Sequence, residues 1–437
     1  MDPKKIKIGL LGFGTVGQGV WKVLEAKKAK FLEHFGLEIE IQRIFVRNPH
    51  KKREIAPPAH SLTMNADDIL NDPNIDIVCE LMGGVELAKE LTLKALVNKK
   101  PIITANKAVI CEHGKEIFRI ANEHETPIFF EASVAGGIPI IKVLREGLAA
   151  NSFPSIYGIL NGTSNYILTR MERESLSFEE TIADARLLGY VEADEALDLD
   201  GIDAAHKTAI LAYLAHGKWI SPSEMIIDGI RNISQLDIRF ARECGYKIKL
   251  LAKIEANLKK NLISASVCPT FVPINESIAS VDEVYNGITL IGDVVGKVML
   301  TGRGAGMNPT ASAVVSDIID CARLHCAHKN PYDASLGKEN SDIALCPPEN
   351  IFEKFYLRLS VADKTGTLAE ICKSLSNNDI SVATMKQLTG PEEGTATLLL
   401  TLHQASEQSM QTALHHLKEL PIVLDNPFLA RIMSTHH

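Results

Sequence analysis

The chain has 437 residues, and its 46 lysines and arginines against 54 aspartates and glutamates give a formal net charge of −8. A nucleic-acid partner would need a basic face, so this charge argues against one. No apolar run reaches the roughly 18 residues of a membrane span, and the N-terminus enters a predicted strand without a signal peptide. The eight cysteines lack metal-ligand spacing, which predicts reduced thiols in a cytoplasmic protein of two or three domains.

A glycine-rich turn follows the first predicted strand, residues 6–11, and precedes a helix that runs to about residue 30. Strand, GxGxxG and helix in this order form the dinucleotide-binding fingerprint. The first glycine permits the tight turn, the second lets the backbone approach the pyrophosphate, and the third lets helix and strand pack closely. The predicted cofactor-binding residues of this turn are Gly12, Phe13, Gly14, Thr15, Val16 and Gly17.

The second predicted strand, about residues 38–46, ends in a basic run that begins with Arg47. A site that prefers NAD usually has an acid here for the ribose 2′-hydroxyl, whereas an arginine can bind the 2′-phosphate of NADP. The pattern therefore favours NADP(H), with NAD(H) possible. A solvated basic turn is the alternative.

Two further buried strands are predicted at residues 76–82 and 101–104, with helices near 67–70 and 85–97. Ligands bind at the carboxyl ends of strands in an open parallel sheet. Thr104 and the nearby Lys107 are therefore candidate cofactor contacts, and an exposed loop lysine is the alternative reading of Lys107.

The stretch at residues 189–214, GYVEADEALDLDGIDAAHKTAILAYL, places six carboxylates before an apolar helix. Asp200 is a suitable N-cap, with Asp203 three residues later and Lys207 one further turn along the same face. Burying such charges is costly unless they are paired. A capping box with a salt bridge is the simple alternative. The apolar helix and the surplus of acids favour an active-site lysine oriented by an aspartate, beside carboxylates for a cationic substrate.

A strand predicted at residues 157–160 leads into Asn-Gly-Thr-Ser-Asn at 161–165. The amides and hydroxyls of this turn could receive a carboxylate. A helix cap by Thr163 or Ser164 is the alternative.

The acid-rich stretch resembles the signature of homoserine dehydrogenases, in which such a loop leads into a Gly-hydrophobic-Asp-Ala-Ala-basic-Lys helix. The resemblance covers essentially the whole chain and implies NAD(P)-dependent interconversion of L-homoserine and L-aspartate 4-semialdehyde. It implies proton transfer by Lys207, orientation by Asp203 and assistance by Lys107, and the two lysine roles could be exchanged. The expected substrate contacts are Glu192 and Asp198 for the ammonium, and Gly162 and Thr163 for the carboxylate.

The sequence at residues 129–139, FFEASVAGGIP, links the first domain to the second. A turn that presents carbonyls beside a carboxylate suits a hard cation or a hinge. The resemblance implies a structural sodium ion, bound at Glu131, Val134, Gly136 and Ile138.

The α/β fold expected for the chain begins with a Rossmann-type dinucleotide-binding domain, residues 1–130 plus 305–327. A helix near 310–324 returns to this domain, and the resemblance places Gly306 against the cofactor. Between the two parts we expect an α+β catalytic and dimerisation domain, residues 131–304, with an open sheet that is also a subunit face.

A polar linker, residues 328–350, should precede a small C-terminal domain, residues 351–437. Strands, a hairpin and two helices there predict a βαββαβ unit, which resembles an ACT domain. ACT domains usually bind amino acids, so threonine is the expected effector of a homodimer or homotetramer, in a form without a preceding aspartokinase. A tail that only holds the oligomer together is the alternative.

Two rival functions are testable. Aspartate-semialdehyde dehydrogenase needs a nucleophilic cysteine, and Cys79 and Cys111 have no activating partner near them in the sequence. A catalytically inactive nucleotide-binding sensor would not need the Asp203 and Lys207 pair.

Overall fold

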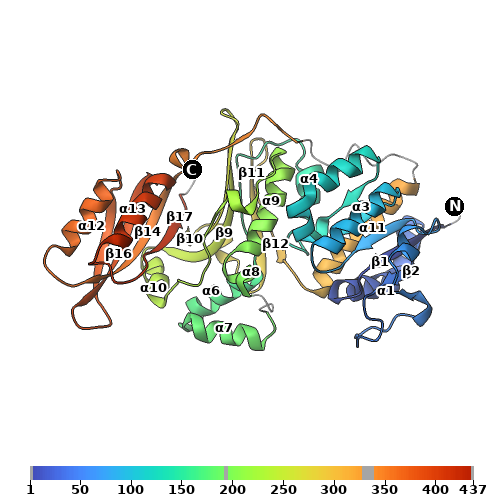
Figure 1. The fold of residues 1–437 in the computed structure, drawn as a ribbon, viewed down its shortest axis with the longest axis horizontal. Helices are drawn as coiled ribbons and strands as arrows, with labels where there is room; N and C mark the ends of the chain where they lie inside the picture. The colour runs from blue at the N-terminus through green and yellow to red at the C-terminus, as the bar shows by residue number, and fades with distance from the viewer. Residues whose placement is uncertain (1–2, 191–194, 327–338, 435–437) are drawn as a thin grey trace. The chain divides into compact units, whose positions relative to one another are not determined.

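The computed structural model describes residues 3–190, 195–326 and 339–434 (Figure 1). The chain divides into two compact units: residues 1–153, 206–222 and 292–341 form the first, and residues 154–205, 223–291 and 342–437 form the second. Across the described ranges, no helix has both the length and the apolar character needed to cross a membrane.

The first unit contains a six-stranded parallel sheet in the order β3-β2-β1-β4-β5-β6. Its strands are β1 (Lys4–Leu11), β2 (Leu37–Phe45), β3 (Leu62–Thr63), β4 (Ile77–Glu80), β5 (Ile102–Thr104) and β6 (Ile128–Phe129). This order is that of a doubly wound dinucleotide-binding sheet. The predicted Rossmann-type architecture is therefore confirmed, although the two-residue strands β3 and β6 were missed because so short a strand has no readable pattern.

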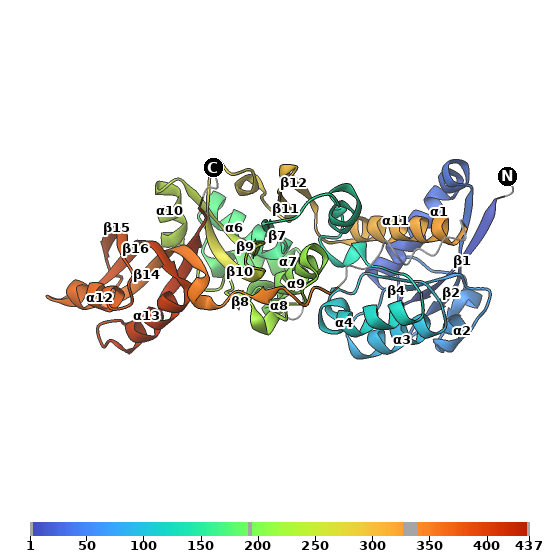
Figure 2. The ribbon, with the colours of Figure 1, turned by 90° about the horizontal axis from the view of Figure 1, so that it is seen from above.

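Helices cover both faces of this sheet. They are α1 (Thr15–Phe35), α2 (Asp67–Leu70), α3 (Glu86–Val97), α4 (Lys107–Glu123) and α11 (Met307–Cys326). Figure 2 shows α1 and α11 on one face and α3 and α4 on the other. A Cβ on Gly19 would lie 2.8 Å from Met307 Cγ and 3.0 Å from Ala311 Cβ, so glycine lets α1 and α11 approach closely. Helix α11 thereby completes the core of the first unit.

Short elements complete the first unit. They are α5 (Ile140–Lys142), a π-helical turn (Val143–Gly147) and strand β12 (Gly296–Arg303). Helix α9 (Ile202–His216) begins in the second unit and continues in the first.

The second unit is built on a mixed sheet that runs β11-β7-β9-β10-β17-β14-β16-β15. Its central strands are β7 (Ser155–Ile159), β9 (Tyr246–Asn257), β10 (Leu262–Pro273) and β11 (Tyr285–Gly292), with β8 (Ile226–Ile227) and β13 (Ala344–Leu345) paired to β10. Helices α6 (Gly162–Glu174), α7 (Phe178–Leu187), α8 (Glu195–Leu199) and α10 (Gln235–Glu243) belong to this unit.

The chain ends in a βαββαβ arrangement, which confirms the predicted order of elements. It consists of β14 (Phe352–Ala362), α12 (Thr367–Ser376), β15 (Val382–Thr389), β16 (Thr395–Ser406), α13 (Glu407–Glu419) and β17 (Phe428–Ile432). Its strands pair antiparallel in the order β17-β14-β16-β15, and Figure 2 shows α12 and α13 on one face.

This C-terminal unit, residues 352–433, shares one sheet with the rest of the second unit. Thr270 and Phe271 of β10 pair in parallel with Arg431 and Ile432 of β17. The ring of Phe271 stacks on that of Tyr356 with centroids 4.5 Å apart. The C-terminal unit is therefore packed as part of a larger body and does not stand alone.

Candidate functional site

The glycine-rich turn joins β1 to α1 through a backbone that side chains would obstruct. Gly12 has φ +103°, and a Cβ there would lie 2.7 Å from the Leu81 carbonyl oxygen. A Cβ on Gly17 would lie 2.8 Å from the Gly12 carbonyl oxygen, whereas a Cβ on Gly14 would meet nothing within 4 Å. Gly12 and Gly17 are thus required by the turn itself. Gly14, the N-cap of α1, leaves the face open where a phosphate can meet the helix N-terminus.

The basic run after β2 contains two arginines with different surroundings. Arg47 is exposed, two residues beyond the carboxyl end of the strand. Arg53 instead donates from Nε to the Phe13 carbonyl at 3.3 Å and from Nη2 to the Asn48 carbonyl at 2.9 Å. Arg53 therefore ties this loop to the glycine-rich turn, and Arg47 is the one available to a 2′-phosphate. Sequence reasoning did not separate these two roles.

A buried carboxylate, Glu80, joins the ends of β4 and β5. It is 0% exposed and accepts hydrogen bonds from the Met82 amide at 2.9 Å and the Thr104 hydroxyl at 2.6 Å. Thr104 Oγ1 in turn accepts from the Asn106 amide at 2.9 Å, and the Asn106 side chain caps α4, which begins at Lys107. Burial raises the pKa of Glu80 to about 7, and its hydrogen bonds oppose that rise.

Glu80 and Asn106 were not among the predicted site residues. An acid within the apolar strand at 76–82 was a readable signal for a buried polar contact. The partner of that acid was not readable, because Thr104 lies on a neighbouring strand. Together these side chains set the backbone at the edge where Lys107 begins its helix.

In the second unit, Asn161 organises the acid-rich region. Its Oδ1 accepts from the Ser164 amide at 2.8 Å and caps α6, so neither Thr163 nor Ser164 is the cap. Its Nδ2 donates to Asp198 Oδ1 at 2.7 Å and to Asp203 Oδ2 at 2.9 Å. The side chains of all three residues are buried. Two predicted acids are thus brought together by an amide that the sequence pattern places only in the turn.

The two hydroxyls of the turn bind neighbouring backbone. Thr163 Oγ1 donates to the Tyr190 carbonyl at 2.8 Å, and Ser164 Oγ donates to the Asp198 carbonyl at 2.7 Å. A Cβ on Gly162 would lie 2.8 Å from the Val284 carbonyl oxygen, so only glycine fits there without a shift. The α6 N-terminus is therefore held tightly at the position predicted for the substrate carboxylate.

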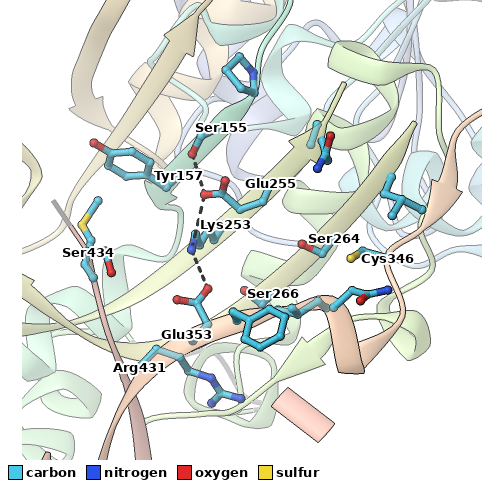
Figure 3. A pocket seen from close by; sticks show the side chains of 18 of the residues that line it. Ser155, Tyr157, Lys253, Glu255, Ser264, Ser266, Cys346, Glu353, Arg431 and Ser434 are labelled. Atoms are coloured by element: carbon cyan, nitrogen blue, oxygen red, sulfur yellow. Dashed lines mark hydrogen bonds and ion pairs between the residues drawn. The ribbon is translucent and has the colours of Figure 1, made fainter. Parts of the chain in front are cut away.

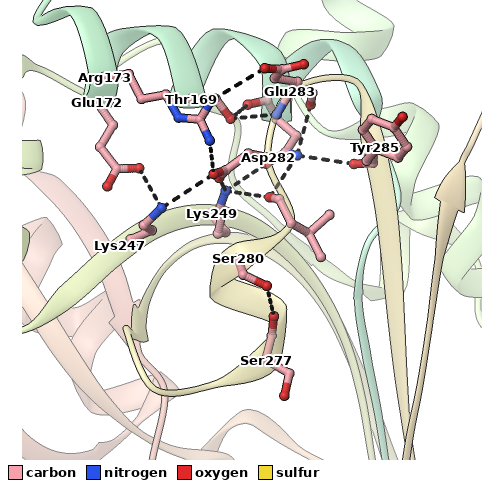
Figure 4. A network of polar contacts seen from close by, with 12 residues as sticks. Thr169, Glu172, Arg173, Lys247, Lys249, Ser277, Ser280, Asp282, Glu283 and Tyr285 are labelled. Carbon is pink, nitrogen blue, oxygen red and sulfur yellow. Dashed lines mark hydrogen bonds and ion pairs between the residues drawn. The ribbon is translucent and has the colours of Figure 1, made fainter.

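A network of buried polar groups anchors the next turn of α6 (Figure 4). Asn165 Nδ2 donates to the carbonyls of Val281 at 3.1 Å and Glu283 at 2.9 Å. Lys249, 1% exposed, donates to Asn165 Oδ1 at 3.1 Å and to Asp282 Oδ1 at 2.9 Å. A buried lysine paired in this way holds the segment 281–285 against the helix.

Helix α9 carries the predicted Asp203 and Lys207 one turn apart, and their exposed fractions are 5% and 7%. The predicted N-cap is wrong, because α9 begins at Ile202 and is preceded by Gly201 with φ +82°. Asp200 instead forms an ion pair with Arg231, Nε to Oδ1 at 2.6 Å.

The remaining acids of this stretch have different outcomes. Glu195 pairs with Arg186 at 2.5 Å, so part of the surplus of acids serves a partly exposed ion pair. Glu192, predicted to bind the substrate, and its neighbour Asp194 lie outside the described residues.

The linking turn near residue 131 is bent and buried. The two Glu131 carboxylate oxygens accept from the amides of Ile141 and Lys142, each at 2.9 Å. Burial raises the pKa of Glu131, and burial beside Glu131 raises the pKa of Asp317 to about 8. A Cβ on Gly136 would lie 2.8 Å from the backbone oxygen of residue 304. A buried carboxylate beside backbone carbonyls, as at Glu131, is chemically compatible with a hard cation.

Two other predicted metal-binding residues are buried, and the predicted cofactor contact Gly306 has a left-handed backbone conformation. Val134 and Ile138 are 0% and 2% exposed, and Gly306 has φ +111° immediately before α11. Within the described part of the chain, no group of three or more His, Cys, Asp or Glu side chains could hold a metal ion. A cation in the linking turn would therefore depend on main-chain oxygens.

A cavity of about 740 Å³ lies elsewhere in the second unit, over β7, β9 and β10 (Figure 3). Four of its polar side chains are paired: Lys253 bonds Glu353 at 2.7 Å, and Ser155 bonds Glu255 at 2.8 Å. None of the predicted site residues that the structure describes lines it.

Cys79 and Cys111 are poorly suited to nucleophilic catalysis. Burial raises the pKa of Cys111 to about 12 and that of Cys79 well above its usual range. The reactive thiolate is therefore disfavoured at both positions.

Comparison with known proteins identifies the family. A family model described as "Homoserine dehydrogenase" matches residues 139–319, and one described as "Homoserine dehydrogenase, NAD binding domain" matches residues 12–131. Homoserine dehydrogenase of Synechocystis sp. is 40% identical over 434 residues, which cover 98% of this chain and 100% of that protein. Homoserine dehydrogenase of Helicobacter pylori is 41% identical over 430 residues, 98% of this chain and 99% of that protein.

Solved structures agree. The crystal structure of a homoserine dehydrogenase from Thiobacillus denitrificans is 39% identical, with a TM-score of 0.89 and coverage of 99% of both chains. A hyperthermophilic archaeal homoserine dehydrogenase in complex with NADPH is 26% identical, with a TM-score of 0.61, and the match covers 73% of this chain and 98% of that one.

Proposed function

The chain belongs to the homoserine dehydrogenase family, and from this premise we propose that Lys207 transfers the proton of the reaction. The enzyme is an NAD(P)-dependent oxidoreductase that interconverts L-homoserine and L-aspartate 4-semialdehyde. In the reducing direction, hydride from the nicotinamide adds to the aldehyde carbon, C4, and Lys207 protonates the carbonyl oxygen. In reverse, the neutral amine takes the proton from the hydroxyl. Asp203 orients the amine, and Lys107, at the start of α4, assists.

The observation that carries this proposal is the amide of Asn161 joined to two buried carboxylates, those of Asp198 and Asp203. A neutral amide stabilises both acids without cancelling their charge, so they can attract the substrate ammonium. Asp198 binds that ammonium together with Glu192. The substrate carboxylate binds at Gly162 and Thr163, because the N-terminus of α6 offers amides and a favourable dipole.

NADP(H) is the preferred cofactor, held by the turn at residues 12–17 and by Thr104, Lys107 and Gly306. The exposed Arg47 beside this turn supports the preference, as does the NADPH bound to the archaeal relative. A sodium ion stabilises the bend at Glu131, Val134, Gly136 and Ile138, where burial disfavours the charged form of the Glu131 carboxylate.

The C-terminal unit acts as an ACT domain that binds threonine and inhibits, and it pairs between subunits of a homo-oligomer. Its strand order supports this role, as does Gly366, φ +95°, at the start of α12 without a side-chain cap. Truncation near Glu349 would uncover the ring of Phe271, so the full-length chain is the better test. Rising threonine should reduce the rate, and indifference to millimolar threonine would leave only the oligomerisation role.

The direct test of the reaction is consumption of NADPH by the purified protein with L-aspartate 4-semialdehyde. We expect turnover that Lys207→Ala abolishes while NADPH binding is retained. Normal turnover in a folded Lys207→Ala protein would overturn the assignment of Lys207, and no turnover by the parent protein would overturn the proposed reaction.

A further inference from the structure

Four consecutive residues, 228–231, contact the C-terminal unit at one end and the acid-rich region at the other. They follow β8 directly, and the amide of Asp228 donates to the Val267 carbonyl of β10 at 2.9 Å. No residue of this segment was predicted to have a functional role. The contacts of this segment with both regions lie within the second unit.

At one end, Asp228 is bound by Arg431 of β17. Arg431 is 6% exposed, and its Nη2 also donates to Glu407 Oε1 at 2.6 Å. Glu407, the first residue of α13, is 2% exposed. A buried guanidinium needs both carboxylates, so the location of Asp228 depends on where β17 and α13 of the C-terminal unit lie.

At the other end, the next three residues enclose the end of α8. A Cβ on Gly229 would lie only 2.3 Å from the Leu199 carbonyl oxygen, and the Ile230 amide donates to the same oxygen at 2.8 Å. Arg231 pairs with Asp200 at 2.6 Å. Backbone packing this close leaves no room for Leu199 to move independently of residues 229–231.

Leu199 directly follows Asp198, which is assigned to the substrate. The Asp198 carbonyl accepts from Ser164 Oγ, and its carboxylate accepts from Asn161 Nδ2. A shift of residues 229–231 therefore displaces a carboxylate whose surroundings are otherwise fixed by α6.

We propose that Asp228 and Arg431 are positioning residues, through which the C-terminal unit sets the location of Asp198 for the substrate. The inference rests on the proposed substrate role of Asp198. A ligand that displaces β17 or α13 then changes affinity for the amino-acid substrate and leaves cofactor affinity unaffected. Such an effect requires that the ligand bind the two positions of the C-terminal unit with different affinity.

The first test compares Asp228→Asn with Lys386→Gln in the full-length enzyme. Lys386 of β15 also joins the C-terminal unit to the rest of the second unit, through Glu243 of α10 at 2.6 Å, but this ion pair does not include residues 228–231 or α8. Asp228→Asn should raise KM for L-aspartate 4-semialdehyde about three- to tenfold, with kcat and KM for NADPH unchanged. Lys386→Gln should leave all three constants near those of the parent. Equal increases in KM for both variants, or no increase for Asp228→Asn, would overturn the proposal.

A second variant protects the test against misfolding. Arg231 and Asp200 are partly exposed, so Arg231→Gln should fold normally and still loosen the contact with the end of α8. We expect a smaller rise in the same KM. The double variant with Arg431→Gln and Asp228→Asn should raise this KM no more than the more affected single variant does. The reason is that both substitutions break the same contact, the one between Asp228 and Arg431. Additive effects would overturn the shared route.

Asp198→Asn separates this inference from the function on which it rests. A rise in substrate KM for Asp198→Asn without one for Asp228→Asn would overturn only the positioning role. An unchanged KM for Asp198→Asn would overturn the substrate assignment and the positioning role together.

Discussion

The carboxyl edge of the first unit and the acid-rich region of the second are each organised by one buried polar side chain. At the edge, the charged group is central: the Glu80 carboxylate gathers an amide and a hydroxyl around itself. In the acid-rich region the neutral group is central, since the Asn161 amide gathers the carboxylates of Asp198 and Asp203. The first arrangement fixes the backbone around an acid whose pKa is raised by burial. The second holds two carboxylates side by side, which we propose serve a cationic ligand.

Lys207→Ala tests the acid-rich region most severely. Removal of the proposed proton donor should lower kcat about a hundredfold or more, the usual scale for general acid–base catalysis. NADPH binding, measured by fluorescence titration, should be unchanged. Lys107→Ala is the matched control, and a larger loss of kcat there would exchange the two lysine roles.

Asn161→Asp replaces the central amide with a third carboxylate of the same shape, which can still cap α6. Like charges then oppose one another around Asp198 and Asp203, so kcat/KM for the amino-acid substrate should fall about thirtyfold at pH 8. Part of the loss should recover on acidification, because the protonated acid can donate a hydrogen bond as the amide does. A loss of kcat/KM that does not change with pH, or an equal rise in KM for NADPH, would contradict this electrostatic role of Asn161.

The two regions also differ in how far sequence alone could predict them. The turn at residues 12–17 was predictable because glycine spacing encodes a backbone shape, and the sheet order observed is the one that this turn implies. The apolar α9 with Asp203 and Lys207 was predictable from helical spacing.

The contacts that were missed join residues distant in the chain. Asn161 reaches carboxylates 37 and 42 positions away, and Glu80 reaches a hydroxyl 24 positions away. Asp200 was predicted as a helix cap from local pattern, but its ion pair is with Arg231, and Gly201 precedes the helix. Periodicity carries no information on such pairings, since they depend on how separate strands and helices pack.

Arg47→Ala tests the cofactor edge at a single exposed side chain. Loss of the proposed charge-assisted contact with the 2′-phosphate should weaken NADPH binding about tenfold and leave NADH binding nearly unchanged. Arg53→Gln is the informative control. It removes the hydrogen bond to the Phe13 carbonyl in the glycine-rich turn, so it should weaken the binding of both cofactors alike. Equal losses for the two cofactors in Arg47→Ala would show that Arg47 also supports the turn.

Glu80→Gln should have the smallest effect on turnover and a distinct effect on stability. Burial raises the Glu80 pKa from its ordinary 4.5 to about 7 in the folded protein. Between pH 4.5 and pH 7 the folded state binds more protons than the unfolded state. The contribution of Glu80 to stability is therefore fully present below pH 4.5 and is lost as the pH rises to 7. Glutamine cannot ionise, so the variant should gain roughly 2 to 3 kcal/mol relative to the parent between pH 5 and pH 8.

Thermal unfolding at the two pH values measures this difference, and exposed Glu86→Gln is the control that should show none. The glutamine oxygen can accept from Met82 while its amide donates to Thr104 Oγ1, so the shape of the edge is retained. A parallel pH dependence in parent and variant would mean that Glu80 stays ionised throughout. The two regions would then differ only in geometry and in which group, carboxylate or amide, is central.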